Sequence, residues 1–290
     1  MTEHRRPGER DPQTSTVARV RVERYGARSA RGASDLVVVE EPLRVHVEHG
    51  GVQLLLGSTI RTPGHDLELA VGLAVGEGVV RRAADVRAVR PCRDGRGAMD
   101  NDVTVVLDDD VALDTDRLGR VQSPSSACGL CGRDEIEAIV ERAPVVRSDV
   151  LVDPDVLVAL PAAMQERQSV FRRTGGLHAA ALASADGRIG VVREDVGRHN
   201  AVDKAVGRAL LDGAAADVLV VSGRAGFEIV QKAAMAGIPV VVSVSAPTSL
   251  SVEVARACGL TLAAFVRDDR MTVYAGAERL RHDGAEAASW

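Results

Sequence analysis

The chain is short of aromatic residues, of cysteines and of long apolar runs, and each shortage excludes a class of protein. Only 2% of its 290 residues are aromatic and its net charge is −5, so it lacks both the stacking residues and the basic charge typical of nucleic-acid-binding proteins. Four cysteines are too few for a disulfide framework, which indicates reduced thiols. No apolar run reaches the roughly 20 residues of a membrane helix. Residues 1–16 are charged and lack the apolar centre of a signal peptide, so we expect a disordered tail and a cytoplasmic protein.

Two parts of the chain differ in their pattern. Residues 17–120 are expected to be β-rich, with strands predicted by alternating or apolar stretches at 17–25, 36–39, 43–47, 52–56, 86–89 and 103–107. One helix is expected after the Pro63-Gly64 turn.

Residues 121–276 alternate between apolar runs and helical patterns. Strands are predicted at 189–192, 218–221, 240–244 and 262–266, and helices at 154–168, 201–211, 227–236 and 250–257. Such alternation indicates an α/β core of three layers, in which helices cover both faces of a largely parallel sheet. Residues 277–290 are expected to form a C-terminal tail.

Cys128 and Cys131, in the segment SSACGLCG, are the strongest chemical signal in the sequence. They lie in a loop before a predicted helix, and a helix N-terminus lowers the pKa of a nearby thiol. A second thiol two residues away can resolve a disulfide or persulfide on the first. Metal binding, redox exchange and sulfur carriage all remain open for this pair. Cys92 and Cys258 stand alone, so no second C-x-x-C completes a structural zinc site.

Polar residues and small-residue turns follow several predicted strands, at the edge where α/β sheets bind ligands. In REDVGRHN, six polar groups are expected to converge there, although a solvated loop with a capping Asn is the alternative. The small-residue turns after two strands would present free N–H groups to phosphate, which predicts a large anionic ligand such as a nucleotide. A buried structural histidine is the alternative for His178, and a charged hairpin turn is the alternative for 265–270. The candidate residues are His178, Arg198, His199, Ser222, Gly223, Arg224, Ser245, Thr248, Phe265, Val266, Arg267, Asp268, Asp269 and Arg270.

Together these segments resemble the FdhD family, the formate dehydrogenase accessory sulfur carriers, over residues 41–276. The resemblance rests on RTPGHDLELAVG, SSACGLCG, TGGLHAAAL, REDVGRHNAVDKAVG, VSGRAGFEIVQKAAMAGIPVVVSVSAPTSL and GLTLAAFVRDDR. So many segments in one order are far more specific than a lone C-x-x-C.

The resemblance implies a function, a fold and partners. Family members accept sulfur from a cysteine desulfurase as a persulfide. They pass it to the molybdenum cofactor, bis(molybdopterin guanine dinucleotide), before that cofactor enters formate dehydrogenase. The resemblance also implies a cytidine-deaminase-like core, a homodimer and no permanent metal. Cys128 matches the persulfide-bearing position, Cys131 its helper, and residues 265–270 the region associated with the guanine dinucleotide cofactor.

Two alternatives to sulfur transfer remain. A cofactor-binding chaperone would deliver the cofactor without transferring sulfur. A zinc deaminase would need H-x-E before P-C-x-x-C, but His178 follows the cysteine pair and lacks the Glu, and Pro124 is not adjacent to Cys128.

Overall fold

The structure is a computed structural model that describes residues 16–26, 29–93, 99–113 and 143–281. The cysteine pair, the helix expected after it and nearly all of the predicted N-terminal tail lie outside the described residues. Among the described helices, none is long and apolar enough to cross a membrane.

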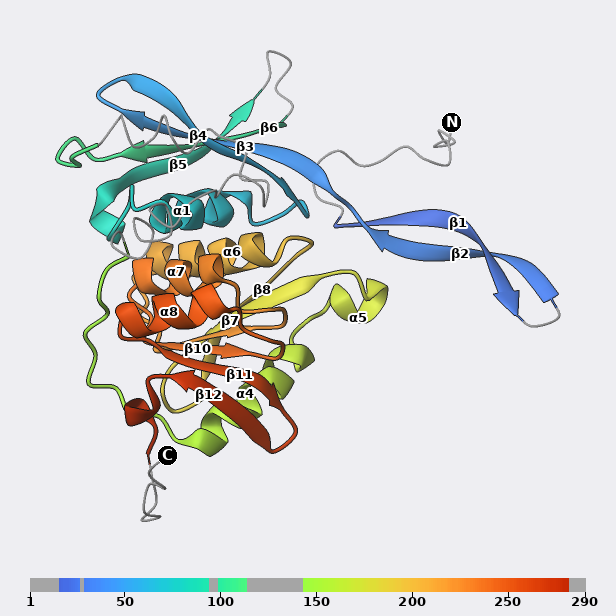
Figure 1. Ribbon diagram of the computed structural model, residues 1–290. Helices are drawn as coiled ribbons and strands as arrows, with labels where there is room; N and C mark the ends of the chain where they lie inside the picture. Colours follow the sequence, from blue (N-terminus) through green and yellow to red (C-terminus); the bar gives the residue numbers. More distant parts are fainter. Residues whose placement is uncertain (1–15, 27–28, 94–98, 114–142, 282–290) are drawn as a thin grey trace.

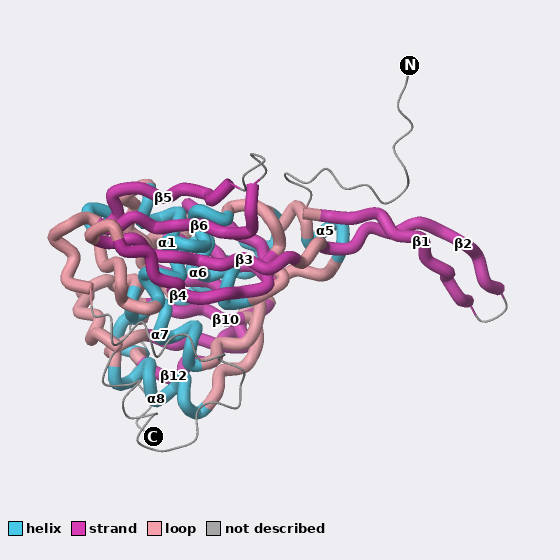
Figure 2. Tube along the Cα trace, turned by 90° about the horizontal axis from the view of Figure 1, so that it is seen from above, coloured by secondary structure: helices cyan, strands magenta, loops and turns pink. Residues whose placement is uncertain are grey.

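The first part of the chain forms two sheets and one α-helix. Strands β1 and β2 form a two-stranded antiparallel sheet of their own, which stands away from the rest of the molecule (Figure 1 and Figure 2). The next four strands form a sheet in the order β4-β3-β6-β5, and helix α1 lies against it. The elements are β1 Val17–Gly26, β2 Ser29–Val38, β3 Glu41–His49, β4 Val52–Arg61, α1 Asp66–Gly76, the 3-10 turn η1 Ala83–Asp85, β5 Val86–Arg93 and β6 Met99–Leu107.

The second part is a six-stranded sheet in the order β12-β11-β10-β9-β7-β8 with helices on both faces. Its α/β class is as predicted. Its elements are α4 Pro154–Glu166, α5 Phe171–Thr174, β7 His178–Ala183, β8 Ile189–Asp195, α6 Arg198–Leu211, β9 Val218–Val221, α7 Phe227–Met235, β10 Val240–Ser243, α8 Ser249–Ala257, β11 Thr261–Arg267, β12 Arg270–Ala275 and η2 Ala277–Arg279.

The prediction of a largely parallel sheet is wrong. Only β9, β10 and β11 pair in parallel, whereas β7 and β8 pair antiparallel, as do β7 and β9, and β11 and β12. The physical reason is that short turns join β7 to β8 and β11 to β12, and a tight turn can join only antiparallel neighbours. The sequence pattern also failed to reveal β7, because a run of alanines has little strand propensity.

Alternate residues of the central strands face two hydrophobic clusters. In β9, Val218 and Val220 pack with α4, whereas Leu219 and Val221 pack with the helices of the other face. The cluster that contains Leu219 and Val221 continues through α6 and α1 into the four-stranded sheet, so both sheets share one core. The molecule is therefore a stack of sheet, helices, sheet and helix, as Figure 1 shows. The likeness to cytidine deaminases remains a prediction.

Helices α1 and α6 cross at backbone contact through two glycines. A Cβ on Gly72 would lie 1.8 Å from the carbonyl oxygen of Asp203, and a Cβ on Gly207 would lie 1.9 Å from that of Glu68. No side chain fits between the helices at these positions. This close crossing fixes α6, and with it the N-terminal residues Arg198 and His199, against the rest of the fold.

Candidate functional site

Parallel pairing brings the ends of β9, β10 and β11 to one edge of the six-stranded sheet. Because β7 is antiparallel to β9, its first residue, His178, lies at the same edge. The backbone N–H of Ser222 donates to the carbonyl of Ala179 at 3.0 Å, and the N–H of Ala179 donates to Ser222 Oγ at 2.9 Å. These bonds fix the start of the turn after β9 beside His178.

A cavity of about 760 Å³ opens at this edge, between the strand ends and α4. Its volume lies within the range of small-molecule sites. Its other walls come from α4, which supplies Val158, Pro161 and Gln165, and from Phe171 and Leu177 before β7. The predicted residues that line it are His178, Ser222, Val266, Arg267 and Asp268.

Gly223 allows the turn after β9 to approach two cationic or ionisable side chains. A Cβ at this position would lie 3.2 Å from His178 Nδ1 and 3.8 Å from Arg198 Cδ. The buried Nε of Arg198 has no hydrogen-bond partner among the described residues. A buried guanidinium N–H without an acceptor is costly, so this position is suited to an anionic group of a ligand.

The surroundings of His178 favour its neutral form. Partial burial lowers its pKa, and the positive charges of Arg198 and His199 lower it further, whereas Asp195 acts in the opposite direction. A neutral imidazole can accept as well as donate a hydrogen bond.

Replacing Arg198 by Met should raise the pKa of His178, because the variant loses a nearby positive charge. The pKa can be measured from the pH dependence of the ring signals in an NMR titration. The matched control is Arg188→Met, in the turn between β7 and β8, which should leave the titration of His178 unchanged. A pKa that stays the same in Arg198→Met would show that the two side chains do not interact.

The end of β11 and the turn after it have an unusual backbone. Phe265 and Asp268 adopt left-handed conformations with φ of 54° and 57°, and the ladder with β12 is irregular between Ala264 and Arg267. Such conformations are uncommon for residues other than glycine and concentrate at functional sites. The N–H of Phe265 donates to the carbonyl of Ser245 at 3.2 Å, and the phenyl group is 40% exposed. An exposed aromatic residue near the end of β11 is therefore bonded to the turn after β10.

Most of the polar cluster in REDVGRHN holds the fold together instead of facing a ligand. Asp195 is fully buried and pairs with Lys204 at 2.6 Å. Asn200 donates to the carbonyl of Ile60 at 2.8 Å, and Glu194 accepts the N–H groups that begin α5. The expectation that all six converge on a ligand is therefore wrong, because five of them have partners within the protein: Arg193, Glu194, Asp195, His199 and Asn200.

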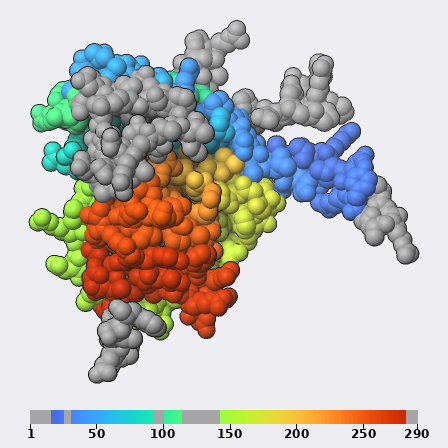
Figure 3. Space-filling model, in the orientation of Figure 1, coloured from blue at the N-terminus to red at the C-terminus, as the bar shows by residue number. Residues whose placement is uncertain are grey.

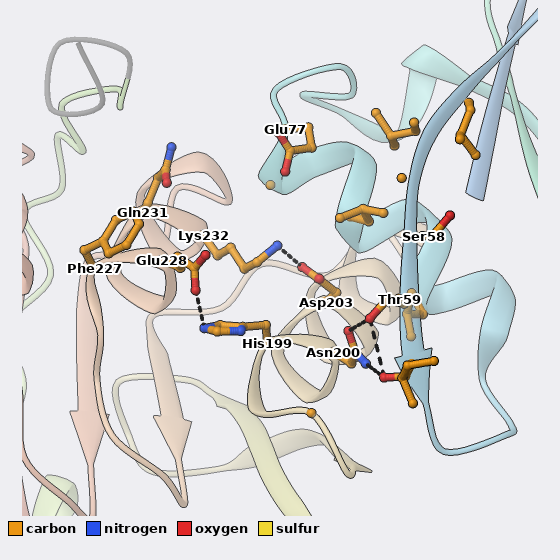
Figure 4. A pocket seen from close by; sticks show the side chains of 18 residues that line it. Ser58, Thr59, Glu77, His199, Asn200, Asp203, Phe227, Glu228, Gln231 and Lys232 are labelled. Carbon is orange, nitrogen blue, oxygen red and sulfur yellow. Dashed lines mark hydrogen bonds and ion pairs between the residues drawn. The ribbon is translucent and has the colours of Figure 1, made fainter. Parts of the chain in front are cut away.

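His199 lies on a different cavity from His178. This second cavity, of about 650 Å³, is bounded by β4, α1, α6 and α7. Figure 4 shows the ion pair between His199 Nε2 and Glu228 at 2.6 Å, and the pair between Lys232 and Asp203 at 2.7 Å. The hydrogen bond from His199 lowers the pKa of Glu228. The predicted histidines thus line two cavities, one on each side of the N-terminus of α6.

The remaining candidates lie around the rim of the strand edge. Thr248 caps α8 by accepting the N–H of Ser251 at 3.2 Å, so it has a structural role whether or not it also meets a ligand. Arg224 is exposed after β9, Asp269 is exposed in the turn before β12, and Arg270 is exposed at the start of β12. No sequence pattern indicated that α4 forms a cavity wall, because its apolar residues fit an ordinary core face.

The cysteine pair is flanked by two packed residues. Leu113 and Ala143, the last and first described residues on either side of the segment, both contact the core cluster shared by the two sheets. Of the cysteines that the structure describes, Cys92 is half-buried and Cys258 is buried, and both are free thiols. No three His, Cys, Asp or Glu side chains within the described ranges are grouped to hold a metal ion.

Comparison with known proteins shows the family. The sequence profile of the FdhD/NarQ family matches residues 38–281. The chain is 46% identical over 271 residues to the sulfur carrier protein FdhD of Anaeromyxobacter dehalogenans, covering 89% of this chain and 93% of that one. It is 44% identical over 252 residues to the FdhD protein of Corynebacterium efficiens, covering 83% of this chain and 90% of that one.

A solved structure has the same fold. It is a crystal structure described as a formate dehydrogenase accessory protein from Desulfotalea psychrophila, with a TM-score of 0.71 and 24% identity over 92% of this chain and all of that one. At that identity the likeness concerns the fold alone. The matches in sequence, which extend over most of each relative, establish that the chain belongs to the FdhD/NarQ family of sulfur carrier proteins.

Proposed function

We propose that this protein takes persulfide sulfur from a cysteine desulfurase on Cys128 and transfers it to bis(molybdopterin guanine dinucleotide), before that cofactor enters formate dehydrogenase. We propose the cytoplasm as the place of this reaction. The FdhD name of the relatives supports sulfur carriage in general. The choice of a guanine dinucleotide cofactor as the acceptor is supported by the edge of the sheet at the strand ends. There, Arg198, Arg267 and an exposed Phe265 surround or adjoin one cavity.

The first step is an exchange of sulfur between two cysteines. The Cys128 thiolate attacks the outer sulfur of the desulfurase persulfide, the S–S bond of that persulfide breaks, and the desulfurase leaves as a thiolate. Cys128 then carries the persulfide, with no net oxidation or reduction.

The second step releases sulfur at the oxidation level of sulfide. The Cys131 thiolate attacks the inner sulfur of Cys128, so that a Cys128–Cys131 disulfide forms and hydrosulfide leaves with the electron pair. Exchange of this hydrosulfide for an oxygen ligand of the molybdenum, with uptake of one proton from solvent, releases water. A cellular dithiol then reduces the disulfide and restores both cysteines.

The residues of the strand edge fit the acceptor as a substrate. A guanine dinucleotide offers phosphates, and the unpaired Arg198 Nε and the exposed Arg224 and Arg267 offer charge-assisted hydrogen bonds to them. Phe265 offers a ring for stacking on a base. His178, whose pKa is lowered by partial burial, can exchange protons with the departing sulfur.

Replacing Arg267 or Arg224 by Ala should weaken binding of guanosine diphosphate, used as a probe for the guanine dinucleotide. Loss of one charge-assisted hydrogen bond predicts an increase in Kd of about tenfold or more for each variant. Isothermal titration calorimetry measures this directly. Arg188→Ala is the control, since Arg188 is also exposed and lies at the other edge of the sheet. Unchanged affinity in both variants would contradict the phosphate assignment.

Mass spectrometry tests the sulfur step. After incubation of the protein with a cysteine desulfurase and cysteine, we expect the wild-type protein to gain one sulfur atom, located by peptide mapping on Cys128. The adduct should be absent from Cys128→Ala and present in the control Cys258→Ala. If neither cysteine of the pair gains sulfur, the protein acts instead as a chaperone that binds the cofactor without transferring sulfur.

A further inference from the structure

Gln168 is a buried polar residue whose side chain has no partner among the described residues. It is 4% exposed, and its amide forms no hydrogen bond within the described ranges. Its backbone N–H donates to the carbonyl of Gln165 at 3.2 Å, and its own carbonyl accepts the N–H of Arg172 at 3.2 Å, so only the amide is left over. The other buried polar and charged side chains that the structure describes all form hydrogen bonds: Arg61, Thr62, Glu68, Asp102, Thr104, Asp195, Asn200, Asp203, Lys204, Ser243, Ser251 and Thr261.

The side chain of Gln168 belongs to the wall of a cavity. It lines the cavity of about 760 Å³ at the strand ends, together with Ser222 and Arg267. A buried amide without a hydrogen-bond partner destabilises a protein, whereas a methionine of similar size would carry no such cost. A ligand that bonds to the amide inside the cavity removes this cost, so Gln168 is suited to recognising a ligand.

The surroundings of Gln168 in this cavity are apolar. Met164 and Leu177, which are 0% and 6% exposed, line the cavity together with Phe171. Apolar walls with one amide fit a flat heterocyclic ring, since such a ring buries its faces against the walls and presents its polar edge to the amide.

The wall that contains Gln168 is held in place from several sides. Glu194 accepts the N–H of Val170 at 3.0 Å and the N–H of Phe171 at 2.7 Å, which fixes the start of α5. On its outer side α5 contacts β2, and the space-filling view shows the surface around α5, coloured yellow-green, beside the blue base of that strand (Figure 3). A side chain on a fixed backbone loses little entropy when it binds a ligand, so the amide is preorganised.

An amide offers an N–H donor next to a carbonyl acceptor in one plane. Guanine and pterin rings share a 2-amino-4-oxopyrimidine edge, in which a ring N–H lies next to a carbonyl oxygen. The side-chain carbonyl of Gln168 can therefore accept the ring N–H while its NH₂ group donates to the ring carbonyl. The proposed acceptor contains both kinds of ring, and Arg267 on the same cavity is available to its phosphates.

We propose that Gln168 is a specificity-determining residue, which selects the acceptor by two hydrogen bonds to the 2-amino-4-oxopyrimidine edge of its guanine or pterin ring. The ring lies between the apolar walls with its polar edge toward the end of α4. This inference rests on the proposed function, since that function supplies the ligand. It assigns recognition of the ring to a residue outside the turns that bind phosphate.

Calorimetric titration of the full-length wild-type protein and of Gln168→Met with three probes tests the proposal. Guanosine diphosphate carries the edge on guanine, 6-hydroxymethylpterin diphosphate carries it on pterin, and purine riboside 5′-diphosphate lacks it. At least one of the two edge-bearing probes should bind wild type about tenfold or more tightly than purine riboside 5′-diphosphate, which leaves the amide carbonyl without a partner. Gln168→Met should raise the Kd of that probe about tenfold and change the Kd of purine riboside 5′-diphosphate by less than about threefold. The probe that is weakened identifies the ring that enters the cavity.

The matched control is Gln53→Met, which removes an exposed amide on β4, in the other sheet, and should leave every Kd unchanged. The thermal melting point of Gln168→Met should equal or exceed that of wild type, since the variant loses an unpaired buried amide. A purely structural amide would instead lower the melting point and leave all three Kd values unchanged.

Two outcomes would overturn the proposal. One is a Gln168→Met variant that binds both edge-bearing probes as tightly as wild type does. The other is a wild-type protein that binds neither of them more tightly than purine riboside 5′-diphosphate, a result that does not depend on whether the variant folds.

Failure of this inference is distinct from failure of the proposed function. If Arg267→Ala weakens binding of guanosine diphosphate and Gln168→Met does not weaken either edge-bearing probe, the phosphates bind as proposed but Gln168 does not recognise the ring. If the wild-type protein binds neither guanosine diphosphate nor the pterin diphosphate, both the inference and the proposed acceptor are wrong.

Discussion

Gly207→Ala should leave little folded protein, although alanine is the better helix former by about 1 kcal/mol. The added Cβ would lie 1.9 Å from the carbonyl oxygen of Glu68 and 2.8 Å from the backbone nitrogen of Gly72, and neither of these backbone atoms can move alone. Helices α1 and α6 would have to separate, which opens the core shared by the two sheets. We expect the free energy of unfolding to fall by about 3 kcal/mol or more, at or above the upper end for overpacked cores.

Urea denaturation followed by circular dichroism measures this loss. Gly190→Ala in β8 is the control, because the nearest atom to its Cβ is 3.9 Å away and the residue is exposed. It should change the free energy of unfolding by less than about 0.5 kcal/mol. If Gly207→Ala were as stable as Gly190→Ala, the helices would not cross at backbone contact.

Lys204→Met should cost about 3–5 kcal/mol of stability, because it leaves a buried carboxylate without its cation. Lys204 and Asp195 are 1% and 0% exposed, and their charged atoms lie 2.6 Å apart. Lys204 Nζ also donates to the carbonyl of Thr62 at 2.8 Å, and the N–H of Thr62 donates to Asp195 at 3.1 Å. The ion pair and these two hydrogen bonds thus hold the start of α6 against the end of β4, where the two parts of the fold meet.

The double variant Asp195→Asn/Lys204→Met provides the internal check. Because it leaves no unpaired buried charge, it should be more stable than Lys204→Met in the same urea titration. Arg188→Met, which removes an ion pair between two largely exposed side chains, should cost at most about 1 kcal/mol. A loss in Lys204→Met no larger than that of Arg188→Met would show that the buried pair does not hold the two parts together.

The sequence predicted best where a pattern was strong and local. The apolar run of β9 matches the predicted strand from Val218 to Val221, and the helix expected at 154–168 matches α4 closely. Strand direction was predicted poorly, since an apolar run such as AAAL shows neither that it is a strand nor which way it pairs. Those facts depend on the turns and on the rest of the sheet.

For the candidate site, the sequence located the right edge of the sheet but not the roles of its residues. His178, Ser222 and Arg267 do line one cavity. Asp195 and Asn200 belong to the same polar run as Arg198, yet each also bonds to a residue more than 130 positions earlier in the chain, Thr62 and Ile60. Contacts at such separation have no local sequence signal. The wall formed by α4 was missed for the same reason.

The most direct test of sulfur carriage to the cofactor follows a labelled sulfur atom from donor to acceptor. The protein is loaded by a desulfurase with ³⁵S-cysteine, freed from the donor and mixed with bis(molybdopterin guanine dinucleotide). We predict that the label leaves Cys128 and appears in the cofactor, that Cys131→Ala slows its departure, and that Cys128→Ala transfers none. Label that stays on the protein while the cofactor still activates formate dehydrogenase would contradict sulfur transfer.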